Sequence, residues 1–378
     1  MRTELLKATA LLAFLTMSRP DGVADERLAV AALVNGKPVQ LALDTGAEIS
    51  LLFRSAATRL RLNTVTEARR VPALNGAVHV DWSPPCQLEW GSIHQISQFG
   101  IVDVPTYLPW EVDGVIGWND IRDHVVQLDA GRGSWTVLGE MPDGLNAWTK
   151  WKLTRGSRLL TFESYVGDSP VRIGIDTGAN AGVQLSPPRW SQWRSNETAL
   201  PTIEASYTPS GGFVVRDLFH ARSATVGEFT LQDVPVSAAT FSAETAFGQS
   251  DAILGLFALS RLEVLIDGKG GLLYTRPAVK ATRQYAYNRL GAVFVPQDGE
   301  TNAALIAHVA EGSPAARAGI QNGDELLRIG DLDATLWHTD PRVQPLYRFW
   351  SEPASTKLRL VLRHVGHVYE VSVVLEEV

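Results

Sequence analysis

The tetrapeptide Asp-Thr-Gly-Ala occurs twice in this sequence, at residues 44–47 and 176–179, each time after an apolar run. An apolar-apolar-glycine element follows each copy, VIG at 115–117 and ILG at 253–255. Elements repeated in one order indicate that a chain is built from similar structural units. This repeat constrains the fold strongly, because each unit must place its own copy of the motif in equivalent surroundings.

Each unit closes with an apolar stretch that contains an aspartate and a turn, at 124–138 and 261–275. We therefore place the first lobe at residues 25–140 and the second lobe at 147–277. Short alternating apolar segments with turn signals between them, such as Asn35-Gly36, are typical of strands. The sequence predicts a mostly β protein with two pseudo-symmetric lobes, followed by a different C-terminal unit.

Length and composition limit the classes of function. The 378 residues suffice for two or three domains, and a net charge of −7 argues against nucleic acid as a partner, because phosphate binding needs clustered Lys and Arg. The one cysteine, Cys86, excludes an intrachain disulfide and is interpreted as an inert packed thiol. His364 and His367 lie at an expected hairpin turn, where two solvated side chains are a simpler interpretation than a metal site. We predict no metal and no cofactor.

The N-terminus has the composition of a secretory signal. A short positively charged segment precedes the apolar run ATALLAFLTM. The small residues Gly22 and Ala24 that follow would suit cleavage after Ala24. We expect residues 1–24 to direct export of the protein, either to a periplasm or out of the cell. A periplasm fits better, because a chain with one cysteine has no disulfides to stabilise it outside the cell. An uncleaved leader would act as a membrane anchor, and an N-terminal helix packed in the fold is the alternative.

Two aspartates in equivalent loops point to acid–base chemistry. Two carboxylates that face each other cannot both ionise cheaply, so the pair holds one shared proton. One member then acts as a base and the other as an acid, and together they can activate a water for attack on an amide carbonyl. Asp-Thr-Gly is also a good turn sequence, so two surface turns are the alternative. The matching flanks favour the catalytic pair.

At these residues the sequence resembles a known family. Residues 42–47 (ALDTGA) and 174–179 (GIDTGA), with the VIG and ILG elements, are similar to the clan AA aspartic proteases, the retropepsin and pepsin group. The resemblance implies a catalytic dyad of Asp44 and Asp176, a peptide or unfolded protein as substrate, and a complete monomer, since both halves are in one chain. It implies these supporting residues: Thr45, Gly46, Ala47, Thr177, Gly178, Ala179, Gly117 and Gly255.

The same family covers its site with glycine-tipped hairpins. We expect their tips near Asn75-Gly76 and Gly211-Gly212. Tyr207, close to the second tip, is interpreted as a packed aromatic residue in preference to a flap tyrosine.

Three features near the motifs depart from the family or add to its pattern. Leu52 stands eight residues after Asp44, whereas Leu185 stands nine after Asp176, as if one residue were inserted in the second loop. Glu48 is expected to be solvated; pointing inward, it would raise the pKa values of the dyad. Trp118 is expected to pack in the core or between the lobes, with the wall of a substrate pocket as the alternative.

The C-terminal unit, residues 285–378, resembles PDZ domains through the stretch GSPAARAGIQNGDELLRIG at 312–330. The resemblance implies that a peptide C-terminus binds at the loop Leu290, Gly291, Ala292 and Val293, adding a strand to a sheet edge. Pro345 interrupts the segment where the groove helix is expected, and residues 351–355 replace a Gly-containing turn. A PDZ fold kept for packing or regulation is therefore the alternative.

Together these features predict an exported aspartic endopeptidase with a PDZ domain that recognises peptides or regulates the enzyme. The alternative is a non-catalytic scaffold with a protease-like fold that binds peptides or proteins without cutting them. Intact aspartates and glycines in both loops favour the enzyme.

Overall fold

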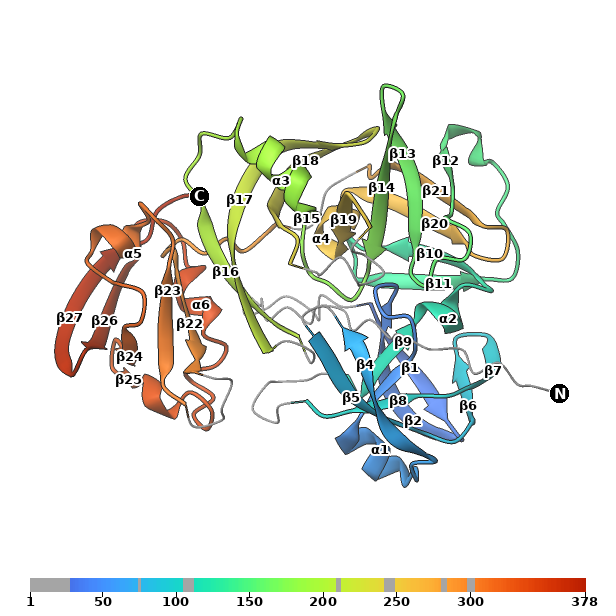
Figure 1. Ribbon diagram of the computed structural model, residues 1–378, viewed down its shortest axis with the longest axis horizontal. Coiled ribbons are helices and arrows are strands. Elements are labelled where there is room, and N and C mark those ends of the chain that lie inside the picture. The colour runs from blue at the N-terminus through green and yellow to red at the C-terminus, as the bar shows by residue number, and fades with distance from the viewer. Residues whose placement is uncertain are drawn as a thin grey trace.

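The computed structural model describes residues 28–73, 76–104, 112–208, 212–240, 249–279, 284–297 and 303–378. The expected leader (1–24) lies outside these residues, as do Asn75 and Gly211 of the expected hairpin tips. Within the described residues the chain is mostly β, as predicted, and its strands form four sheets (Figure 1).

The first lobe is built on a sheet of nine described strands in the order β4-β5-β8-β3-β9-β2-β1-β6-β7. Its first hairpin turns at Asn35 and Gly36, whose φ angles of 50° and 73° are those that the Asn-Gly turn favours. Leu41 and Leu43 alternate along β2 and are fully buried in the core. The strands are β1 (Ala29–Val34), β2 (Lys37–Asp44), β3 (Leu51–Phe53), β4 (Thr66–Ala73), β5 (Gly76–Trp82), β6 (Cys86–Trp90), β7 (Ile93–Ser97), β8 (Gly100–Val102) and β9 (Gly114–Gly117).

The second lobe has a sheet of seven described strands in the order β13-β14-β19-β15-β18-β17-β16. Its centre repeats the first lobe: β14 pairs in parallel with β19 as β2 does with β9, and β15 lies antiparallel to β19 as β3 does to β9. The strands are β13 (Thr161–Val166), β14 (Ser169–Asp176), β15 (Val183–Leu185), β16 (Thr202–Thr208), β17 (Gly212–Val226), β18 (Phe229–Ala238) and β19 (Ala252–Gly255).

A third sheet joins the two lobes, with the described order β11-β10-β20-β21-β12. β10 of the first lobe pairs antiparallel with β20 of the second, with Val126 opposite Ile266. Side chains from both lobes and from this sheet pack into one hydrophobic core, so the lobes hold each other in a fixed arrangement. The strands are β10 (Val125–Asp129), β11 (Ser134–Leu138), β12 (Thr149–Lys152), β20 (Leu262–Asp267) and β21 (Leu272–Pro277).

The C-terminal domain has its own sheet and its own core, which includes Phe294, Trp337 and Trp350. In Figure 1 it lies beside β16 and β17 of the second lobe. Ser313 caps the short helix α5 by accepting the N–H of Ala316, as the Ser-Pro sequence predicts. The strands are β22 (Ala292–Pro296), β23 (Leu305–Val309), β24 (Glu325–Ile329), β25 (Leu332–Asp333), β26 (Lys357–His364) and β27 (His367–Val374).

The described helices are short. Among the described residues no helix has the length and apolar character to cross a membrane. The helices are α1 (Arg54–Leu60), α2 (Trp118–Ile121), α3 (Pro187–Arg194), α4 (Leu256–Leu259), α5 (Pro314–Arg317) and α6 (Tyr347–Trp350), with 3-10 turns η1 (Leu145–Ala147) and η3 (Ala334–Leu336).

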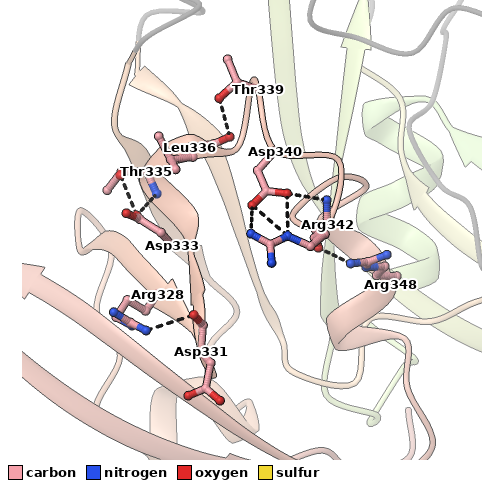
Figure 2. Close-up of polar contacts among 9 residues, drawn as sticks. All are labelled: Arg328, Asp331, Asp333, Thr335, Leu336, Thr339, Asp340, Arg342 and Arg348. Atoms are coloured by element: carbon pink, nitrogen blue, oxygen red, sulfur yellow. Dashed lines mark hydrogen bonds and ion pairs between the residues drawn. The ribbon is translucent and has the colours of Figure 1, made fainter.

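Local polar contacts shape the segment that leads into α6 (Figure 2). Asp333 accepts the backbone N–H of Thr335, and Asp340 accepts both the backbone N–H and the guanidinium of Arg342. The guanidinium of Arg348 in turn donates to the carbonyl of Arg342. The helix α6 follows this segment, begins at Tyr347 two residues after Pro345, and spans a single turn.

Candidate active site

Each motif aspartate is the last residue of a central strand. Asp44 ends β2 and pairs in register with Gly117 of β9, and Asp176 ends β14 and pairs with Gly255 of β19. A Cβ on Gly117 or Gly255 would collide with the backbone of the adjoining loop, so both positions require glycine. The apolar strands therefore deliver the two aspartates to equivalent positions, one from each lobe.

The two threonines tie the loops together. The N–H of Thr45 donates to Oγ1 of Thr177 at 3.0 Å, and the N–H of Thr177 donates to Oγ1 of Thr45 at 3.1 Å. Each hydroxyl also donates to the other lobe, Thr45 to the carbonyl of Ile175 at 2.7 Å and Thr177 to that of Leu43 at 2.8 Å. This reciprocal network fixes the two aspartate loops against each other.

Backbone N–H groups hold each carboxylate. Oδ1 of Asp44 accepts the N–H groups of Gly46 and Ala47 at 2.9 and 3.0 Å. Oδ1 of Asp176 accepts those of Gly178 and Ala179 at 3.0 and 3.1 Å. These bonds orient both side chains and favour their charged forms.

The motif glycines bring each loop against the opposite carboxyl group. A Cβ on Gly46 would lie 2.5 Å from Cγ of Asp176, and one on Gly178 would overlap the carboxyl of Asp44. Any larger residue at either position would push an aspartate away. The glycines thus allow the two carboxyl groups to meet where the lobes join.

The pair is removed from solvent: 2% of Asp44 and 1% of Asp176 is exposed. Burial raises the pKa of Asp176 to about 7, against the opposing effect of the N–H groups of Gly178 and Ala179. Asp176 therefore keeps its proton at acidic pH. A protonated carboxyl next to a second carboxyl is the arrangement that general acid–base chemistry needs.

The extra residue of the second loop is located by hydrogen bonds. The N–H of Trp118 donates to the carbonyl of Ala47 and that of Leu256 to Ala179, so these pairs correspond. The next N–H groups reach Glu48, four residues after Asp44, but Ala181, five residues after Asp176. The insertion is Asn180, which is buried beside the site. Leu52 and Leu185 accordingly pair at matching points of β9 and β19.

The expectation that Glu48 is solvated was wrong. Oε2 of Glu48 lies 2.5 Å from Nη2 of Arg158 and accepts Nε of the same side chain at 2.8 Å, and the side chain of Glu48 is 11% exposed. Arg158 comes from the second lobe, so the ion pair joins the lobes beside the first loop. Sequence reasoning missed Arg158 because nothing near it resembles a motif.

Three aromatic or sulfur-containing residues are packed as their simpler interpretations predict. Trp118 is 5% exposed and lies in the core shared by the lobes. Tyr207 packs edge-on against Phe213, with ring centroids 5.3 Å apart. Cys86 is a buried free thiol.

His364 does not form a metal cluster with His367 among the described residues. Its Nδ1 lies 2.7 Å from Oδ1 of Asp324, which also accepts the hydroxyl of Tyr369. No group of three or more His, Cys, Asp or Glu side chains that could hold a metal ion occurs among the described residues. The side chain of His364 is 42% exposed and His367 is exposed at the turn between β26 and β27, as expected for solvated turn residues.

The four residues expected to bind a peptide terminus, Leu290 to Val293, lie at the start of β22 and are all buried. Oδ1 of Asn288 accepts the N–H groups of Leu290 and Gly291 at 3.1 and 3.0 Å. The loop therefore already holds an acceptor from its own chain. The sequence offered no sign of this, because Asn288 belongs to none of the patterns that carry the resemblance.

One family of known proteins matches the segment that contains the first Asp-Thr-Gly-Ala motif. Residues 30–119 match the family model described as aspartyl protease. This supports an aspartic protease, a peptidase of the hydrolase class, with a peptide as its substrate.

A solved structure, described as EIAV protease complexed with the inhibitor HBY-793, is 21% identical with a TM-score of 0.22. The match covers 26% of this chain and 88% of that one. No curated protein matches the chain.

Proposed function

We propose that this protein is an aspartic endopeptidase that cleaves peptide bonds with a water activated by Asp44 and Asp176. The observation that carries the proposal is the pair of buried aspartate loops, one from each lobe, locked by the reciprocal bonds of Thr45 and Thr177. The match of residues 30–119 to the aspartyl protease model supports it.

The two carboxyl groups take different roles because they share one proton. Asp176, whose pKa is raised to about 7, holds this proton, and Asp44 is the charged partner. Asp44 removes a proton from the water as its oxygen attacks the peptide carbonyl, and Asp176 gives its proton to the carbonyl oxygen. Transfer of a proton from Asp44 to the amide nitrogen then breaks the C–N bond and releases the amine. Asp176 takes back a proton from one hydroxyl of the intermediate, so the new acid forms and the pair regains its single shared proton.

The substrate is proposed to be an extended peptide or an unfolded protein. The two aspartates come from opposite lobes, so the scissile bond must lie along the line where the lobes meet, with one end of the peptide on each lobe. The protein is complete as a monomer in this proposal, because one chain supplies both loops.

The test is cleavage of an unfolded protein mixture across pH 3–8 by residues 25–378, with products identified by mass spectrometry. Asp44→Asn and Asp176→Asn remove one ionisable oxygen each and are expected to abolish cleavage. Asp129→Asn is the matched control, because Asp129 is the last residue of β10 and forms an ion pair with Arg132 in the turn that follows.

Cleavage that persists in both dyad variants, or its absence in the wild type at every pH, contradicts the enzyme. The non-catalytic peptide-binding scaffold would then be the better explanation.

The C-terminal domain is proposed to regulate the second lobe by holding its β16 strand. Ile203 of β16 packs with Val293 of β22 and Ala310, and Nδ2 of Asn288 donates to the carbonyl of Ile203 at 2.9 Å. The hydroxyl of Thr202 donates to the carbonyl of Asn288. The face that a peptide C-terminus would use is thus covered by the chain's own strand.

An apolar cavity of about 90 Å³ remains under β16, lined by Ile203, Val293, Val295 and Leu346 among others. A peptide that entered this groove would have to displace β16. We propose that such a peptide loosens the hairpin of β16 and β17, so that the C-terminal domain couples peptide recognition to the second lobe. We also propose, from the sequence of residues 1–24, that the protein is exported.

A further inference from the structure

The face of the sheet that carries Asp176 has an exact positional counterpart in the first lobe. Leu51 pairs with Val115, and Gln184 pairs with Ile253, and both partners stand two residues before the glycine of their apolar-apolar-glycine element. Gln184 is therefore the residue of the second lobe that corresponds to Leu51.

The neighbouring strands extend this correspondence. Leu51 lies in register with Gly100 and Gln184 with Ser237. Trp82 stands opposite Gly100, and Leu218 opposite Ser237, so Val80 and Arg216, each two residues earlier, also correspond.

The two faces differ in chemistry. In the first lobe, Leu51, Val80 and Val115 belong to one buried apolar cluster with Ala42. In the second lobe the same positions hold Gln184, Arg216, Ile253 and Gly174. Two bulky apolar side chains are thus replaced by an amide and a guanidinium.

The positive charge of Arg216 on this face of the second lobe is balanced by a neighbouring carboxylate. The guanidinium of Arg216 lies 2.9 Å from the carboxylate of Glu204 and donates to the hydroxyl of Ser206 at 2.6 Å. Burial, reinforced by Glu204, raises the pKa of Tyr285, which stays protonated and donates to Glu204 at 2.7 Å. The face is therefore polar without a net charge to attract ions.

Gln184, on the same face, differs from these paired side chains. Its side chain is fully buried, and among the described residues neither its Oε1 nor its Nε2 has a hydrogen-bond partner. Buried amide groups are almost always hydrogen-bonded, because leaving them unpaired is costly. An amide that is kept here without a partner indicates that the partner comes from outside the chain.

Gln184 also lies on the same face of the sheet as the carboxyl of Asp176. Ile253 pairs with both Gln184 and Gly174, and Gly174 is two residues before Asp176 on the same strand, so all these side-chain positions share one face. Asp176 is as buried as Gln184. Any opening that admits a peptide to Asp176 therefore admits it beside the amide.

We infer that Gln184 determines substrate specificity by hydrogen-bonding an uncharged polar side chain on the second-lobe side of the scissile bond. Leu51 and its apolar neighbours take an apolar side chain at the symmetric position on the first-lobe side. The preferred substrate is a peptide with this asymmetry, and the amide of Gln184 supplies both a donor and an acceptor for it. The inference rests on the proposed endopeptidase activity.

Cleavage profiling with a randomised peptide library tests it, with wild type, Gln184→Met and Leu51→Gln compared. Met keeps the length of Gln but removes the amide. In wild type we expect one position to select Asn, Gln, Ser or Thr and its counterpart across the scissile bond to select Leu, Ile or Val. In Gln184→Met, the ratio of kcat/KM for a peptide with Gln at the polar position to its Leu analogue should fall at least about tenfold.

Leu51→Gln is the matched second variant. It should raise acceptance of polar residues at the opposite position only and leave the first position unchanged. An effect on folding alone would lower cleavage of all peptides equally, so a change confined to one position separates recognition from stability.

An unchanged profile in Gln184→Met, in an enzyme that Asp44→Asn inactivates, overturns the inference and leaves the proposed activity intact. Apolar preference at both positions of the wild type overturns it as well. Absence of any cleavage by wild type contradicts the proposed activity, and the inference falls with it.

Discussion

Thr45 and Thr177, 132 residues apart, each donate a backbone N–H to the other's hydroxyl oxygen, at 3.0 and 3.1 Å. Both side chains are buried, with at most 1% exposed. The contact joins the two lobes at the point where the aspartates meet. The geometry of the candidate dyad therefore depends on two hydroxyl groups that themselves take no part in proton transfer.

Replacing Thr45 by Val should disrupt this network with little change in shape. The N–H of Thr177 and the carbonyl of Ile175 would both lose their partner in a buried place, a loss of about 2–4 kcal/mol in the free energy of unfolding. Urea denaturation measures the loss. Thr45→Ser keeps the hydroxyl but loses the methyl group and is the control. A larger loss in Thr45→Ser than in Thr45→Val would show that the methyl group, which Val keeps, counts for more than the hydrogen bonds.

The raised pKa of Asp176 predicts how stability depends on pH. The folded protein holds this proton up to about pH 7, whereas the unfolded chain releases it near 3.8, the usual pKa of an aspartate. The folded state binds more protons between these values, so this carboxyl's contribution to stability is full below about pH 4 and is lost as pH rises to 7.

Thermal melting of wild type and Asp176→Asn from pH 4 to pH 8 measures this contribution. The melting temperature of wild type should fall relative to the variant up to about pH 7 and run parallel above it. Parallel curves over the whole range would mean that Asp176 titrates normally. In wild type, cleavage should also decline above pH 7, as the proton needed by the carbonyl oxygen is lost.

Asn288 is predicted to couple the C-terminal domain to the second lobe. Asn288→Ala would leave the N–H groups of Leu290 and Gly291 unpaired and remove the bond to Ile203, so β16 should be held less firmly. We expect faster hydrogen exchange in residues 202–208 and tighter binding of a peptide with an apolar C-terminus, read by calorimetry.

Asn322→Ala is the matched control for Asn288, because the side chain of Asn322 also accepts a backbone N–H, from Val309, but does so within the C-terminal domain. Exchange in 202–208 that is equal in wild type and Asn288→Ala would contradict the proposed coupling.

Much of the candidate site is readable in the chain itself. The Asp-Thr-Gly-Ala repeat, the apolar strands before it and the apolar-apolar-glycine elements after it depend on local sequence, and the structure brings these residues together at the ends of β2 and β14. The single inserted residue was also visible from spacing, and the structure assigns it to Asn180. Local patterns succeed here because strand alternation and tight turns depend on neighbouring residues.

Contacts between distant segments were not readable. The sequence suggested a solvated Glu48, but Arg158 of the other lobe buries it in an ion pair. It suggested a peptide-binding loop at Leu290 to Val293, and gave no sign that Asn288 accepts the N–H of Leu290 or that Val293 packs against Ile203 of β16.

What the sequence by itself determined is the set of groups available: two aspartates, each held in a loop whose glycine admits a neighbour and whose threonine carries a hydroxyl. Only the tertiary structure decided what each group meets. Raising the pKa of Asp176, pairing Glu48 and leaving Gln184 unpaired all depend on burial and on partners far along the chain, and these follow from how the lobes pack.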